Sequence, residues 1–151
     1  MRTYAPEDVA RQPTGYWSTE ASKRVLAGIR GALAVEALTQ PHWWTLNHVS
    51  GAPGTWNRTT LTTKLSRFAD FMPTGTFDDV YDDLIARGWL VENGTFALTD
   101  AGRLALDRAR DRNAEVHTKM LQNIDPADFV TMINVLRQVI ENLEGDSDLP
   151  T

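Results

Sequence analysis

The sequence predicts a mostly α-helical fold with one small β-hairpin, and three observations lead to this prediction. Apolar residues recur at helical spacing in most segments of the chain. Asn93-Gly94 separates two short apolar runs, which is a strong signal for a tight hairpin. Threonine, aspartate and glycine residues stand where helices commonly begin or end.

The first segment with a clear helical pattern begins near residue 18. Residues 1–17 contain prolines and a glycine and show no helical period, so they are predicted to form an N-terminal arm. Ser18 or Thr19 is expected to cap a helix that runs to about residue 38. Apolar residues recur every four positions along this helix, which predicts that one face of it is buried.

Two shorter helices are expected next. Thr39 is predicted to cap the first of them, with Pro41 in its first turn. The Ser-Gly-Ala-Pro-Gly run at residues 50–54 has the composition of a loop and ends that helix. The second is expected to start near residue 59 or 60 and to end before Pro73.

Another helix and the hairpin follow. Thr76 and Asp79 stand three residues apart, as in a capping box. Gly88 is expected to end this helix in the left-handed conformation that glycine adopts easily. Residues 90–91 and 96–98 are predicted to be the two strands of the hairpin.

Two longer helices are expected to complete the fold. Thr99 is predicted to cap the first, from about residue 100 to 122. Asp125 followed by proline opens the second in the preferred order, and Gly145 ends it. Residues 145–151 are predicted to be a flexible tail.

Helix, turn, helix, hairpin and helix is the order of a winged helix-turn-helix. Residues 84–91 (LIARGWLV) and 96–102 (FALTDAG) resemble the most recognisable stretch of the MarR family of transcriptional regulators. In that family a recognition helix ends at a glycine, a wing hairpin follows, and Leu-Thr-x-x-Gly opens a long helix. Residues 39–46 (TQPHWWTL) are similar to the start of the family's second helix. The resemblance covers about residues 20–144.

The resemblance implies that residues 39–99 form a winged helix-turn-helix whose wing has two or three strands. Dimerisation helices at 18–38 and 100–144 would flank it. The apolar stripes of the first and last helices favour a homodimer as well, because they are too long for so small a winged domain to cover. The alternative is that these stripes pack within one chain. Regulators of this family bind double-stranded DNA, which makes DNA the expected macromolecular partner.

The predicted recognition helix, residues 76–87, carries an unusual charge pattern. At about 100° per residue, its apolar residues gather on one side and four aspartates on the other, which would face DNA. They are Asp78, Asp79, Asp82 and Asp83. Carboxylates there would repel phosphates, and the wing lacks the arginine that MarR-type wings usually carry. The alternative function is therefore a degenerate winged-helix module that binds a protein or a small ligand and has lost sequence-specific DNA binding.

Basic and hydroxyl side chains on or beside the helix-turn-helix are the candidate DNA contacts, because Lys and Arg hold phosphates and hydroxyls donate to phosphate or base. These candidates are Arg58, Lys64, Arg67, Thr74, Thr76, Arg87 and Arg103. The alternative is that they are ordinary solvated surface residues.

The resemblance also implies a small aromatic effector, held between the dimerisation helices and the winged domain. Aromatic side chains would wall such a pocket, and tryptophan N–H groups would orient the ligand. The candidate lining residues are Tyr16, Trp17, Trp43, Trp44 and His48. The alternative is that these rings are core and interface residues.

Several classes of function are disfavoured by composition. The chain has no cysteine, so disulfides and thiolate metal sites are excluded. We find no HExxH pattern, phosphate-binding loop or nucleophile elbow, which argues against an enzyme and predicts no metal and no cofactor. No signal-like N-terminus and no apolar run of membrane-spanning length are present, so we expect a cytoplasmic protein without a membrane partner. The formal net charge of −5 means that a DNA-binding surface must be locally basic.

Overall fold

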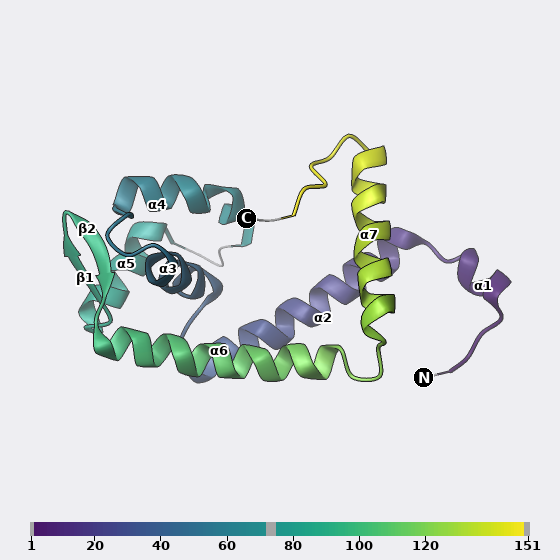
Figure 1. Ribbon diagram of the computed structural model, residues 1–151, viewed down its shortest axis with the longest axis horizontal. Helices are drawn as coiled ribbons and strands as arrows, with labels where there is room; N and C mark the ends of the chain where they lie inside the picture. Colours follow the sequence, from purple (N-terminus) through teal and green to yellow (C-terminus); the bar gives the residue numbers. More distant parts are fainter. Residues whose placement is uncertain (1, 72–74, 150–151) are drawn as a thin grey trace. The chain divides into compact units, whose positions relative to one another are not determined.

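The computed structural model describes residues 2–71 and 75–149, which are mostly helical and include one β-hairpin. The chain divides into two compact units, Met1–Val116 and His117–Thr151. The predicted fold class, mostly α with a small β wing, is confirmed, and the wing has two strands. Figure 1 shows the elements in chain order: α1 (Pro6–Ala10), α2 (Thr14–Val35), α3 (Gln40–Gly51), α4 (Arg58–Leu65), the 3₁₀ helix η1 (Ser66–Phe71), α5 (Phe77–Ala86), β1 (Leu90–Asn93), β2 (Thr95–Leu98), α6 (Asp100–Met120) and α7 (Pro126–Asn142).

The N-terminal helices differ from the sequence prediction. A short helix, α1, lies within the predicted arm, with Pro6 in its first turn. Helix α2 begins at Thr14, earlier than the predicted cap at Ser18 or Thr19. Pro13 stands before it in an extended conformation, and its carbonyl accepts the Trp17 N–H at 3.4 Å. The helix therefore starts without a side-chain cap, because the N-cap position is occupied by proline, which has no hydroxyl.

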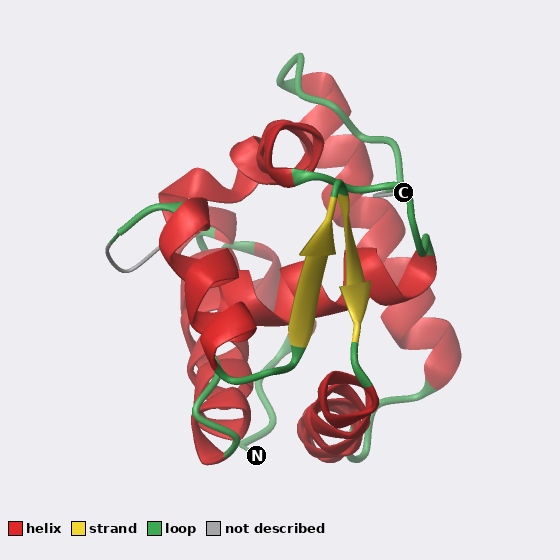
Figure 2. Cartoon of the chain, turned by 90° about the vertical axis from the view of Figure 1, so that its left-hand side faces the viewer, coloured by secondary structure: helices red, strands yellow, loops and turns green. Residues whose placement is uncertain are grey.

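The hairpin between α5 and α6 forms where the sequence predicts it, but its strands are longer than the predicted 90–91 and 96–98, and Asn93 belongs to β1. Strands β1 and β2 pair antiparallel from Leu90 opposite Leu98 to Asn93 opposite Thr95 (Figure 2). Gly94 turns between them with φ +77°. Gly88, at φ +68°, ends α5 in the left-handed region, as expected for a glycine at this position.

Helix α6 is fixed against the hairpin by two residues that the sequence singles out. The hydroxyl of Thr99 accepts the Gly102 N–H at 3.0 Å and donates to the Gly88 carbonyl at 2.7 Å, which confirms the predicted cap. Position 102 leaves no room for a side chain, because a Cβ there would collide with the carbonyl of Trp89. The first turn of α6 therefore lies directly on the start of β1.

The core of the first unit is formed by the winged helix-turn-helix elements. Their fully buried residues come from α3, α4, α5, both strands and α6 and include Leu46, Leu61, Tyr81, Phe96 and Leu106. Leu33 of α2 is fully buried in the same core. The rings of Tyr81 and Phe96 lie 4.9 Å apart between centroids and join α5 to the hairpin. This contact fixes the position of α5 relative to the hairpin.

In the second unit, Asp125 caps α7 as predicted, accepting the Ala127 N–H at 2.8 Å. No residue of α7 is buried, although apolar side chains recur along it. After the helix the chain bends back, and Arg137 donates to the carbonyl of Ser147 at 2.7 Å. Across the residues described, we find no helix whose length and apolar character would let it cross a membrane.

Candidate nucleic-acid interface

The predicted recognition helix is α5, and its inward face is as expected. Its apolar residues are buried in the core, with Tyr81 and Leu84 completely inaccessible to solvent. Asp78 and Asp82 lie on the opposite side, with side chains 64% and 67% exposed. Asp83 does not share that orientation, since its side chain is 40% exposed and contacts α3, which packs against α5.

Arg58, at the first turn of α4, is surrounded by carboxylates. Its Nη1 donates to Asp78 at 3.2 Å, and its Nη2 donates to Asp82 at 2.7 Å. Its Nε and Nη2 also donate to Glu92 of β1 at 3.0 Å. These carboxylates raise the pKa of Arg58 further above its already high value, Glu92 being the largest cause. A predicted phosphate contact is thus already ion-paired within the chain.

Asp79 closes the N-terminus of α5 together with Thr76. The Thr76 N–H and hydroxyl donate to Asp79 Oδ2 at 2.7 and 2.8 Å, and the Asp79 N–H donates back to the hydroxyl at 3.2 Å. These bonds hold the pKa of Asp79 below its usual value. The predicted capping box is confirmed, and the Thr76 hydroxyl is engaged in it.

Asp83 joins α5 to α3. Its Oδ2 lies 2.9 Å from His42 Nε2 and 2.7 Å from Arg87 Nη2. His42 Nδ1 in turn accepts the Thr39 N–H at 3.3 Å, so the imidazole completes the α3 capping box. Arg87 also donates to the Ala37 carbonyl at 2.9 Å. This predicted DNA contact therefore ties the end of α5 to the turn between α2 and α3.

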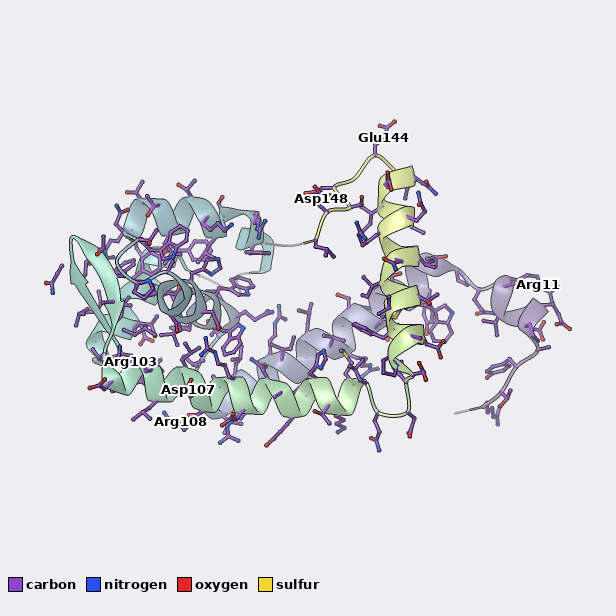
Figure 3. The ribbon with its side chains drawn as sticks, in the orientation of Figure 1. Arg11, Arg103, Asp107, Arg108, Glu144 and Asp148 are labelled. Carbon is purple, nitrogen blue, oxygen red and sulfur yellow. The ribbon has the colours of Figure 1, made fainter. Side chains whose placement is uncertain are left out.

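The other predicted DNA contacts are distributed over three elements. Lys64 lies in the last turn of α4, and the Arg67 guanidinium lies 4.7 Å from the centroid of the Phe68 ring. Arg103 projects from the first turn of α6 (Figure 3), where it donates to the Leu98 carbonyl at 2.8 Å and pairs with Asp100. Thr74 lies outside the described residues.

The predicted pocket residues fall into two groups. Trp43, Trp44 and His48 lie on α3, where the two indoles are partly buried against the core and the Trp44 ring lies 5.0 Å from that of Phe68. Tyr16 and Trp17 lie near the start of α2, are 58% and 56% exposed, and contact each other edge to face. Neither group alone indicates which kind of ligand would bind.

Sequence reasoning missed four residues that organise this surface. Asn57 caps α4 by accepting the Thr60 N–H at 2.9 Å, and the Asn-x-x-Thr spacing would have signalled this. Glu92 and His42 act through partners distant in sequence, for which no local pattern exists. Trp56 accepts the Phe96 N–H at 2.7 Å through its carbonyl and so ties the loop before α4 to the hairpin.

No family model and no curated protein matches the chain, whereas many solved structures do. The Mycobacterium tuberculosis MarR family protein Rv2887, in complex with DNA, is similar with a TM-score of 0.63 and 21% identity over 85% of this chain and 98% of that one. A MarR family regulator from Rhodococcus sp. RHA1 gives 0.63 and 18% over 91% and 96%. The repressor CouR, bound to p-coumaroyl-CoA, gives 0.65 and 23% over 91% and 97%.

The Rhodococcus protein and CouR are transcriptional regulators rather than enzymes. At such identities the likeness concerns the fold, and it extends over most of both chains. The winged helix-turn-helix inferred from the hairpin and its flanking helices is therefore the MarR-type winged helix fold.

Proposed function

We propose that this chain, which has the MarR-type winged helix fold, is a dimeric transcriptional regulator that binds double-stranded DNA in the cytoplasm. The observation that carries the proposal is the unit formed by α3, α4, α5 and the hairpin, in which α5 buries one face and leaves the other exposed beside the wing. A recognition helix needs this arrangement to enter a major groove. A solved structure of the same fold, Rv2887, is in complex with DNA.

Phosphate contacts are assigned to the basic and hydroxyl residues around this unit. Lys64 lies in the last turn of α4 and Arg67 in η1, and Arg103 stands beside the wing at the start of α6. Thr76 and Arg87 mark the two ends of α5. In a dimer each group occurs twice, so both winged units would grip the DNA backbone at half-sites about one helical turn apart.

Dimerisation is assigned to the helices outside residues 39–99, within 18–38 and 100–144. Their apolar side chains remain exposed in the single chain, including Val35 of α2 at 62% and Val135 of α7 at 56%. A second copy of the chain is the proposed cover, because an isologous contact buries the same faces on both copies.

A small aromatic molecule is the proposed effector. Rv2887 has been solved with salicylic acid, and CouR with p-coumaroyl-CoA. In this chain Tyr16, Trp17, Trp43, Trp44 and His48 are the proposed lining, where indole rings offer apolar walls. Quenching of tryptophan fluorescence by salicylate would support this assignment, and indifference to a broad panel of aromatic acids would contradict it.

The test of DNA binding is a titration of the protein against the DNA upstream of its own coding region, followed by fluorescence anisotropy. Specific binding that exceeds binding to a shuffled duplex, and that weakens as salt rises, is the expected result. No binding at low salt, where the phosphate interaction is strongest, would contradict the proposal.

A second function is favoured by the exposed carboxylates of Asp78 and Asp82 on the outer face of α5. The winged unit would then be a module for a protein or small-molecule partner that has lost sequence-specific DNA binding. The same titration separates the two functions, since this alternative predicts no preference for the upstream DNA over the shuffled duplex.

A further inference from the structure

We propose that Asp78, Asp82 and Glu92 compete with DNA phosphate for Arg58, so that this intramolecular clamp sets the DNA affinity of the winged unit. The inference rests on the proposed function, because it concerns the surface that would face DNA. It assigns these three carboxylates a role different from that of Asp79 and Asp83, although four of these five residues share one helix.

The guanidinium of Arg58 has little left to offer a phosphate. Glu92 accepts from Nε and Nη2 at 3.0 Å, Asp82 accepts from Nη2 at 2.7 Å, and Asp78 accepts from Nη1 at 3.2 Å. An arginine side chain has five N–H groups, and one on Nε, two on Nη2 and one on Nη1 are used here. A phosphate must therefore displace at least one carboxylate before it can receive a two-pronged hydrogen bond from Arg58.

The clamp joins the three elements expected to meet DNA. Arg58 begins α4, Asp78 and Asp82 lie on α5, and Glu92 lies on β1 of the wing. The Arg58 side chain is 32% exposed and that of Glu92 33%, so the pair is partly shielded from water and salt. Three carboxylates against one guanidinium leave a local charge of −2, so the closed clamp repels a phosphate instead of attracting it.

The remaining two aspartates are held elsewhere. Asp79 belongs to the capping box with Thr76, and Asp83 belongs to the contact with His42 and Arg87. Replacing them would loosen helix ends without releasing Arg58. They are thus unsuitable for testing the clamp, whereas the side chains of Asp78, Asp82 and Glu92 contact Arg58 and, in the described part of the chain, cap neither α5 nor β1.

The test is a double-mutant cycle between Arg58→Gln and the neutralised triple variant Asp78→Asn/Asp82→Asn/Glu92→Gln. Binding of each protein to a fluorescein-labelled duplex of mixed sequence is measured by anisotropy at several low salt concentrations. The triple variant is expected to bind about tenfold more tightly than the wild type, because hydrogen bonds from a charged donor to phosphate become available. In that variant Arg58→Gln should cost about tenfold and lower the slope of log K against log salt by about one unit.

The cycle separates competition from simple charge repulsion. If the carboxylates only repel DNA, Arg58→Gln weakens binding by the same factor with and without them, and this additive result would overturn the inference. Competition instead requires a distinctly smaller loss in the wild type than in the triple variant. Melting curves check that each protein is folded, and the single change Asp82→Ala, which removes the shortest bond, provides the cycle if the triple variant does not fold.

A matched control removes the same charges from α6. Asp107→Asn/Asp111→Asn/Glu115→Gln alters two aspartates and one glutamate at exposed positions of the same unit, none of which contacts Arg58 in the described part of the chain. Because α6 lies within the proposed dimerisation helices, sedimentation velocity checks that this control keeps the oligomeric state of the wild type. It should raise the affinity less than the clamp variant and show no coupling to Arg58→Gln. Equal gains in the two triple variants would overturn the inference.

The outcomes also distinguish the inference from the proposed function. Wild-type binding with an additive cycle overturns the inference and leaves the regulator proposal intact. Binding by the clamp variant alone supports the inference and contradicts DNA binding by the native chain. Absence of binding in every variant at low salt overturns both.

Discussion

At the scale of single residues, His42 is the side chain on which two elements of the winged unit depend. Its Nδ1 accepts from the backbone of Thr39 at 3.3 Å, and its Nε2 lies 2.9 Å from Asp83. This pattern is satisfied by a neutral imidazole that carries its proton on Nε2 and donates it to Asp83. The α3 cap and the α3–α5 contact therefore share one protonation state.

This arrangement predicts a loss of stability in mild acid. Burial lowers the pKa of His42 below its ordinary 6.5, against the opposing effect of Asp83. The folded chain then binds fewer protons than the unfolded chain. The contribution of neutral His42 to the free energy of unfolding is therefore present above about pH 6.5 and is lost as the pH falls below it. Urea unfolding at about pH 7.5 and about pH 5.5 should show a lower free energy of unfolding at the acid end.

His42→Gln isolates the imidazole in the same measurement, since glutamine keeps hydrogen-bonding groups but does not titrate. Glu36 works in the same direction at lower pH, because its bonds to Arg108 and Arg112 hold the pKa of its carboxyl below the usual value. Its contribution is present above its unfolded pKa of 4.5 and is lost as the pH falls through the lower folded value.

An equal drop in the free energy of unfolding between about pH 7.5 and about pH 5.5 in the His42→Gln variant and the wild type would show that His42 is not responsible.

At the scale of elements, the close approach of α6 to the hairpin depends on a glycine, Gly102. Gly102→Ala would drive a Cβ into the carbonyl of Trp89, which is backbone and cannot rotate away. We expect this single methyl group to cost about 2 kcal/mol of unfolding free energy. The control is Gly31→Ala in α2, where a Cβ meets nothing within 4 Å and a small gain is expected from helix propensity. Equal effects of the two changes on the urea midpoint would contradict this account.

The elements divide clearly into those that sequence reasoning predicts and those that it does not. The Thr76 cap, the Gly88 stop and the Thr99 cap are local signals, because each partner lies within a turn or so along the chain. The predicted start of α2, at Ser18 or Thr19, was wrong because the helix begins after Pro13, where no side chain caps it. Local rules therefore recovered the order of elements better than their exact bounds.

The candidate site was less predictable because its important contacts are distant in sequence. Arg58 meets Asp78, Asp82 and Glu92 across separations of 20, 24 and 34 residues. The helical wheel correctly separated the apolar face of α5 from the aspartates, but it does not include the elements that pack beside the helix. It therefore grouped Asp83 with the outward residues, although α3 supplies His42 on that side.

At the scale of the whole molecule, the distribution of apolar surface is the basis for proposing self-association. The first unit has a core of its own, whereas α7 has no buried residue and exposes Val130, Met132, Val135 and Ile140. Burial is worth roughly 25 cal/mol per Å² of apolar surface, so a helix that leaves these side chains in water forgoes most of its stabilisation. The proposed second copy supplies the missing cover, and the stability of α7 then depends on protein concentration.

Val135→Asp should therefore shift the chain from dimer to monomer in sedimentation velocity at micromolar concentration. A carboxylate at a covered position must be desolvated on both copies, because an isologous interface repeats the change. Val91→Asp on β1 is the matched control, since Val91 is also an exposed valine, at 40%, but lies on the wing. It should leave the sedimentation coefficient unchanged. If the wild type sediments as a monomer, or if the two variants dissociate it equally, α7 is not the dimerisation helix and two-fold DNA recognition loses its structural basis.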